Sequence, residues 1–201
     1  MCECINSQLP QSYKGLTSKF RIKNGPALWE AEVFSEDGEE VAEIKKGEGP
    51  EFKMLSKKDG REWVLSNKID GEHRRFSFSV REEGKNHDAL LMIRDNVFKH
   101  NGKFYMLANQ PEGRSWQQYV DSPVRYISRL DNFPYSDLTE MDESKQHHTL
   151  KQKLKRFRGV PVGEASGLGI SPEGHNVKVN DELDDIGLFL AATSYLMYAQ
   201  A

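Results

Sequence analysis

Pairs of turn-forming residues recur at regular spacing through the first half of this chain, and they constrain its fold more than any other feature. Each pair places Asn, Asp or Glu before glycine, and successive pairs lie 11, 13 or 18 residues apart. Asn-Gly and Asp-Gly favour the positive φ angles of tight hairpin turns. The spacing therefore predicts short antiparallel strands joined by hairpins. The pairs are Asn24-Gly25, Asp37-Gly38, Glu48-Gly49, Asp59-Gly60, Asp70-Gly71, Glu83-Gly84 and Asn101-Gly102.

The segments between these turns alternate in polarity from one residue to the next. Phe76, Phe78 and Val80, for example, alternate with Ser77 and Ser79. A period of two is typical of a strand that turns one face toward a core. The predicted fold class is therefore mainly β with a few helices, an antiparallel meander curled into a sheet or barrel.

The longest apolar run lies near the C-terminus, between Ile186 and Ala199. It falls short of the roughly 20 residues that a helix needs to cross a bilayer. A helix that is apolar on nearly every face must still be surrounded. We expect it to fill the centre of the barrel, with an oligomer interface and membrane insertion as alternatives. The residues expected to form this core helix are Ile186, Leu188, Phe189, Leu190, Tyr195 and Leu196.

Four acidic residues precede this run, namely Asp181, Glu182, Asp184 and Asp185. Acids in a first helical turn interact favourably with the helix dipole, which is the simplest explanation for them. Carboxylates can also bind calcium, but the spacing is not that of an EF-hand. We expect no cofactor, and calcium binding by these four acids is the weaker alternative.

A basic segment is the main candidate for ligand binding. Leu150, Leu154 and Phe157 fall on one helical face, which predicts an amphipathic helix over residues 145–158 on the outside of the sheet. Its cations could be solvated, or they could bind phosphate and anionic lipid. These candidate lipid- and anion-binding residues are Lys151, Lys153, Lys155, Arg156 and Arg158.

The glycine-rich stretch Gly159–Gly174 follows, and it predicts a long loop or an irregular pair of strands. Strands are expected on either side of the basic segment, over Val124–Ser128 and His175–Val179. We expect one domain over residues 17–201, with residues 109–174 as a candidate insertion and residues 1–16 as a flexible tail.

Charge and cysteine content narrow the choice of partner and compartment. The net charge of −3 disfavours a nucleic-acid partner. The two cysteines, Cys2 and Cys4, cannot frame a disulfide-built domain, and the N-terminus has no secretory signal pattern. We therefore expect a cytoplasmic protein, with peripheral membrane association as an option.

The chain resembles the tubby C-terminal-like superfamily, which includes phospholipid scramblases and LURP-one-related proteins. The similarity lies in Leu183-Asp184-Asp185 before the apolar run, in Phe20-Arg21-Ile22, and in the hairpin at Asp37-Gly38. The resemblance implies a twelve-stranded antiparallel barrel closed around a central C-terminal helix.

The resulting functional expectation is a non-enzymatic binding module for anionic phospholipid head groups or membrane surfaces. One alternative is a protein-interaction adaptor without lipid binding. Another is an enzyme with its site in the 109–174 region, which holds His147, His148 and several carboxylates but no recognised catalytic pattern.

Overall fold

The described residues of the structure, which is a computed structural model, form twelve strands and one C-terminal helical segment. The structure describes residues 16–24, 30–70, 75–92, 97–109, 125–131, 159–166 and 174–198. The elements are β1 (Leu16–Asn24), β2 (Ala31–Ser35), β3 (Glu40–Lys46), β4 (Glu51–Ser56), β5 (Glu62–Asp70), β6 (Arg75–Glu82), β7 (Asp88–Met92), β8 (Val97–His100), β9 (Lys103–Asn109), β10 (Arg125–Arg129), β11 (Val160–Ser166), β12 (His175–Asn180), the 3₁₀ helix η2 (Asp181–Ile186) and α4 (Gly187–Tyr198).

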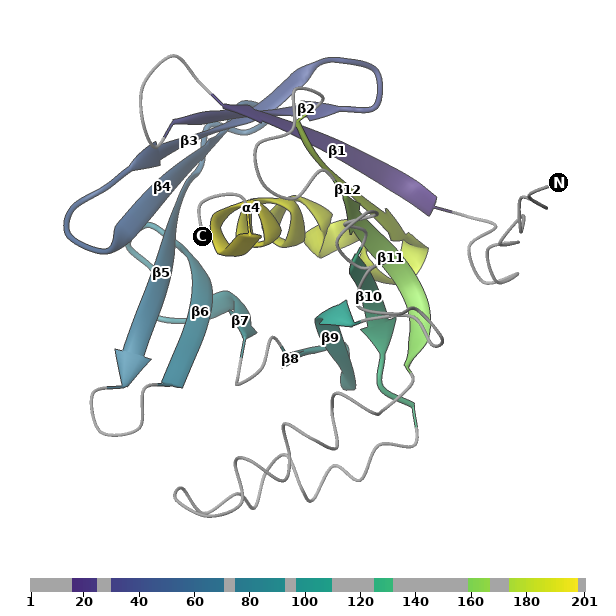
Figure 1. Cartoon of the computed structure of the whole chain (residues 1–201). Coiled ribbons are helices and arrows are strands. Elements are labelled where there is room, and N and C mark those ends of the chain that lie inside the picture. The colour runs from purple at the N-terminus through teal and green to yellow at the C-terminus, as the bar shows by residue number, and fades with distance from the viewer. Residues whose placement is uncertain are drawn as a thin grey trace, which may run out of the picture.

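The strands form a closed antiparallel barrel in which each pairs with its neighbours in sequence (Figure 1). The barrel closes where β1 pairs with β12, with Phe20 opposite Val177 and Ile22 opposite His175. The predicted meander and its closure into a barrel are confirmed. The architecture is also the one that the superfamily resemblance implied.

The hairpin turns occur where the sequence predicts them. Five of the seven glycines are described, and each has a φ angle between +56° and +81°. The remaining two pairs begin at the last residues of β1 and β5, and their glycines lie outside the described residues. Turn chemistry therefore sets the strand lengths in this barrel.

Helix α4 lies inside the barrel, packed closely against β1 and β12 (Figure 1). Leu190, Ala191 and Ala192 are fully buried, and Phe189 meets Trp63 of β5 with 4.5 Å between ring centroids. The expectation of a core helix is confirmed, and Asn180 is the N-cap residue of the preceding segment η2, without a side-chain capping hydrogen bond. The helix begins with the 3₁₀ segment η2, and no helix in the described part of the chain could cross a bilayer.

The prediction for Gly159–Gly174 needs correction in part, because residues 160–166 form the barrel strand β11, which pairs with β10 across a register shift, while residues 167–173 lie outside the described ranges. A Cβ atom at Gly163 would lie 2.6 Å from the Lys178 carbonyl oxygen and 3.2 Å from Ile127 Cδ1. Glycine at this position lets β10 and β12 approach the backbone of β11 closely, and it does not mark a loop. The predicted strands over Val124–Ser128 and His175–Val179 correspond to β10 and β12.

Several expectations concern residues that the structure does not describe. These are most of the tail 1–16 with Cys2 and Cys4, and the basic helix 145–158. Strands β10 and β11 fall within the candidate insertion 109–174, and most of its other residues lie outside the described ranges.

Candidate functional site

Three cations share the outer face of β1. Lys19, Arg21 and Lys23 alternate along this strand with Phe20 and Ile22, which pack in the core. Because successive side chains of a strand point to opposite faces, the apolar pair directs all three cations outward. The sequence of β1 thus serves the core and a basic surface at once.

Neighbouring strands extend this surface on both sides. Lys178 of β12 lies opposite Lys19, and Asn176 lies opposite Arg21. On the other side, Phe34 of β2 lies opposite Arg21. Like charges directly opposite each other in a sheet are destabilising, so the Lys19–Lys178 pair favours a nearby anion.

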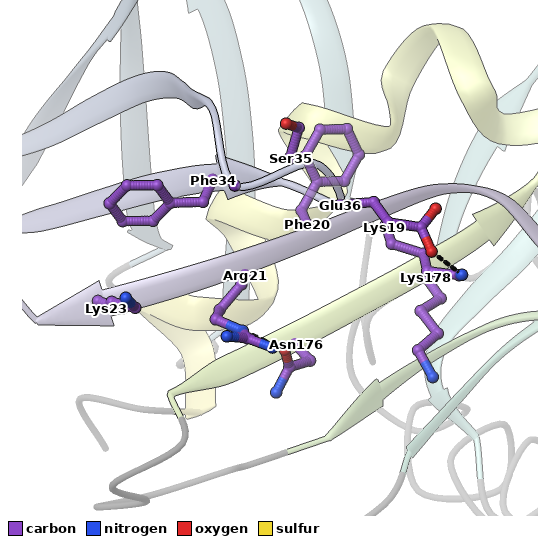
Figure 2. Close-up of a pocket in the computed structure, with 10 residues that line it drawn as sticks. Lys19, Phe20, Arg21, Lys23, Phe34, Ser35, Glu36, Asn176 and Lys178 are labelled. Carbon is purple, nitrogen blue, oxygen red and sulfur yellow. Dashed lines mark hydrogen bonds and ion pairs between the residues drawn. The ribbon is translucent and has the colours of Figure 1, made fainter.

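These side chains line a shallow pocket of about 400 Å³ on the outside of the barrel (Figure 2). Its lining holds four cations and one carboxylate, that of Glu36. We call it the outer pocket, and its residues are Lys19, Phe20, Arg21, Lys23, Phe34, Ser35, Glu36, Gly38, Asn176 and Lys178.

Two of the four cations in the outer pocket are paired with carboxylates. Lys19 forms an ion pair with Glu36, which follows β2 (Figure 2). Lys178 Nζ lies 3.1 Å from Glu164 Oε1 of β11. These two lysines are therefore electrostatically compensated within the protein.

The other two cations have different neighbours. Lys23 Nζ lies 4.9 Å from the centroid of the Phe34 ring, within cation–π range. Arg21 Nε donates a hydrogen bond of 3.4 Å to Asn176 Oδ1. Neither Arg21 nor Lys23 forms an ion pair with any residue that the structure describes. Both side chains are exposed to solvent.

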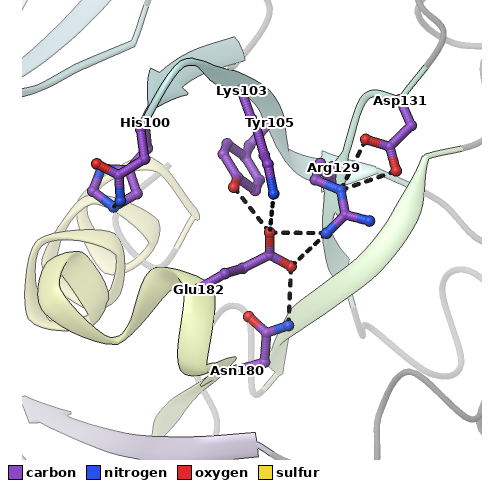
Figure 3. Close-up of polar contacts among 8 residues, drawn as sticks. His100, Lys103, Tyr105, Arg129, Asp131, Asn180 and Glu182 are labelled. Carbon is purple, nitrogen blue, oxygen red and sulfur yellow. Dashed lines mark hydrogen bonds and ion pairs between the residues drawn. The ribbon is translucent and has the colours of Figure 1, made fainter.

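A second polar cluster lies around Glu182 of η2 (Figure 3). Arg129 Nη1 donates to both Glu182 carboxylate oxygens at 2.8 and 2.9 Å, and the Tyr105 hydroxyl donates at 3.0 Å. Asn180 Nδ2 donates at 3.1 Å, and Arg129 Nε also binds Asp131. These contacts tie η2 to β9 and β10, and we call them the Glu182 cluster.

Protonation equilibria in the Glu182 cluster reflect these contacts. Burial raises the pKa of Glu182, but hydrogen bonds from Asn180, Arg129 and Tyr105 outweigh it and leave the pKa below its ordinary value. The hydrogen bond from Arg129 lowers the pKa of Asp131, against a smaller effect of burial. The pKa of the Tyr105 hydroxyl is raised by burial and by the adjacent Glu182 carboxylate. The Glu182 cluster is thus ionised at neutral pH, and the Glu182 carboxylate accepts hydrogen bonds from three side chains.

The calcium alternative is not favoured by this arrangement. The four acids, Asp181, Glu182, Asp184 and Asp185, do line one surface hollow. However, Glu182 is engaged by Arg129, and Asp185 Oδ1 lies 2.9 Å from His100 Nε2. The described residues contain no group of three or more acidic, His or Cys side chains that could hold a metal ion.

A buried serine–histidine contact joins β12 to α4. His175 Nε2 lies 2.8 Å from Ser194 Oγ, and the two residues are 2% and 0% exposed. A substrate cannot reach a hydroxyl buried in this way, so the pair has a structural role. It positions α4 against β12.

The sequence does not predict the outer pocket, and the structure does not describe the residues that the sequence favours instead. Lys151, Lys153, Lys155, Arg156 and Arg158 all lie outside the described ranges. A signal for the pocket was present, because alternation over residues 19–23 places three cations on one face. Lys178 could not be added from sequence, since its proximity depends on barrel closure.

Comparison of the chain with protein-family models, with curated proteins and with solved structures gives no match.

Proposed function

We propose that this chain is a non-enzymatic module that binds anionic phospholipid head groups at the outer pocket. The observation that carries the proposal is the pair Arg21 and Lys23, two outward cations that form no ion pair with a described residue, although Glu32 of β2 is the cross-strand neighbour of Lys23. Residues two apart on a strand are separated by about 7 Å, so both cations can contact one phosphate group. Guanidinium and ammonium groups are the usual protein ligands of phosphate.

The filled barrel supports an exterior site. Helix α4 occupies the centre, where Leu190 and Ala191 are fully buried. A ligand inside would have to displace this helix, whereas the outer pocket is open to solvent. Each Lys or Arg near an anionic bilayer contributes about 1 kcal/mol of attraction. The two cations that form no ion pair with a described residue would therefore contribute about 2 kcal/mol of salt-sensitive attraction.

The test is co-flotation of the full chain with vesicles, at low and at near-physiological salt. We expect binding to vesicles that contain a phosphoinositide and none to neutral vesicles. Salt weakens attraction between exposed charges, so binding should fall as ionic strength rises. Absence of binding at both salt concentrations would overturn the proposal and favour the adaptor alternative.

A matched pair of variants locates the site. The double variant Arg21→Glu/Lys23→Glu should lose binding by at least about tenfold, since both free cations become anions. The control Lys58→Glu/Lys85→Glu makes the same change in net charge on exposed turns outside the pocket. Equal losses in both variants would argue against a localised site, and melting temperatures confirm that each variant is folded.

The basic segment 145–158 is a separate prediction and can be tested in the same assay. The variant Lys151→Glu/Lys155→Glu/Arg158→Glu removes the charges that the sequence favoured. If the outer pocket is the principal site, this variant should retain binding that Arg21→Glu/Lys23→Glu loses. The reverse pattern would transfer the site to the segment.

A further inference from the structure

The charged residues in and beside the outer pocket form two groups that differ in net charge. One row crosses four adjacent segments as Glu164, Lys178, Lys19 and Glu36, from β11 through β12 and β1 to the turn after β2. Each lysine in this row has its own carboxylate. The row holds two positive and two negative charges and is neutral.

The second group consists of Arg21 and Lys23, which carry two positive charges. A phosphomonoester carries a charge of about −1.5 to −2 at neutral pH. One such group therefore neutralises this pair. The ring of Phe34, which lies under Lys23, offers an apolar surface to the carbon skeleton of a ligand.

We infer that the outer pocket engages one phosphomonoester at a time, and that Glu36 cancels the gain in affinity that a second phosphate would otherwise bring. The inference rests on the proposed function and goes further by naming the ligand's charge class. Lys19 is the next cation along β1, where it would be the natural partner of a second phosphate. Lys19 already forms an ion pair with Glu36, so a second phosphate near Lys19 would be repelled by the Glu36 carboxylate as well as attracted by the ammonium group.

The backbone holds Glu36 in this position. Ser35 N donates to the Glu39 carbonyl oxygen at 2.8 Å, and Gly38 N donates to the Ser35 carbonyl oxygen at 3.1 Å. Ser35 is also paired with Phe20 of β1, which brings the following residue beside Lys19. The carboxylate is thus presented by a hydrogen-bonded turn within the sheet.

The test compares lipids with one and with two phosphomonoesters on the inositol ring, presented in vesicles at equal mole fraction. The readout is the ratio of the two dissociation constants. We expect the wild-type chain to bind both lipids with affinities within about threefold. Glu36→Gln should improve binding of the bisphosphate by only about fivefold, because exposed ion pairs are individually weak. Binding of the monophosphate should change little, since it does not need Lys19.

Glu39→Gln is the matched control, since Glu39 is exposed on the same turn and does not line the pocket. Equal ratios in Glu36→Gln and Glu39→Gln would overturn the inference, as would a wild-type preference for the bisphosphate of tenfold or more. In both cases vesicle binding itself persists, so the proposed function stands. A wild-type chain that binds neither lipid would overturn the proposed function and this inference with it.

The soluble inositol monophosphate and bisphosphate distinguish a membrane ligand from a free one. We expect each to bind at least about tenfold more weakly than its vesicle-borne counterpart, because the bilayer adds attraction from the remaining cations. Equal affinity for the soluble and membrane forms would contradict a lipid ligand and assign the pocket to a free phosphate ester.

Discussion

At the scale of single residues, Glu182 illustrates how partners from distant parts of the chain define a side chain's role. The sequence predicts it as one of four acids that favour a helix N-terminus or bind calcium. In the structure it lies in the first turn of η2, as predicted, and its carboxylate also accepts hydrogen bonds from Tyr105, Arg129 and Asn180. Arg129 and Tyr105 lie 53 and 77 residues away, so no local pattern could reveal them.

Replacing Glu182 by Gln tests this role through its pH dependence. A carboxylate whose pKa is lowered by folding stabilises the protein above its unfolded pKa, and this stability is lost as pH falls through the folded value. We expect Glu182→Gln to reduce the free energy of unfolding by about 1–3 kcal/mol at neutral pH. The difference should shrink below pH 4.5, the ordinary pKa, as the wild-type carboxylate is protonated.

Denaturant unfolding at neutral and acidic pH measures this difference. Glu83→Gln is the control, because Glu83 is half exposed and its distance to Lys53 Nζ is 3.9 Å. A destabilisation by Glu182→Gln that is equal at both pH values would contradict an ionised network around this residue.

At the scale of elements, helix α4 and strand β11 show which signals in the sequence are sufficient to predict an element of the fold. The run from Ile186 is apolar on all sides, and this predicts a helix that is buried, whether by the barrel, by a second subunit or by lipid. Strand β11 has no comparable signal, because Pro161 and Gly163 are residue types that are typical of loops. Its role depends on the close approach of Lys178 and Ile127 on the adjacent strands, which only the assembled sheet reveals.

Two leucines of α4 test its place in the core. Leu190 is fully buried, whereas Leu188 is partly buried at the edge of the same core. We expect Leu190→Ala to cost about 2–5 kcal/mol, which is typical of a cavity in a packed interior. Leu188→Ala should cost clearly less, since part of its side chain is already in water. Equal costs by denaturant unfolding would contradict the packing of α4 inside the barrel.

At the scale of the whole molecule, closure of the barrel creates the outer pocket. The turn spacing predicts the meander, and the superfamily resemblance implies its closure, but neither specifies the register between the first and last strands. That register places Lys178 opposite Lys19 and Asn176 opposite Arg21. The architecture could therefore be predicted from the sequence, while the location of the candidate site required the three-dimensional structure.

The central claim is that an anionic head group binds outside a filled barrel, at the outer pocket. Amide chemical shifts of the full chain during titration with soluble inositol monophosphate test it most directly. We predict that the largest shift changes occur over residues 19–23, 34–38 and 176–178, with little change in α4. Changes concentrated in α4 or around Glu182, or confined to residues 145–158, would contradict the claim.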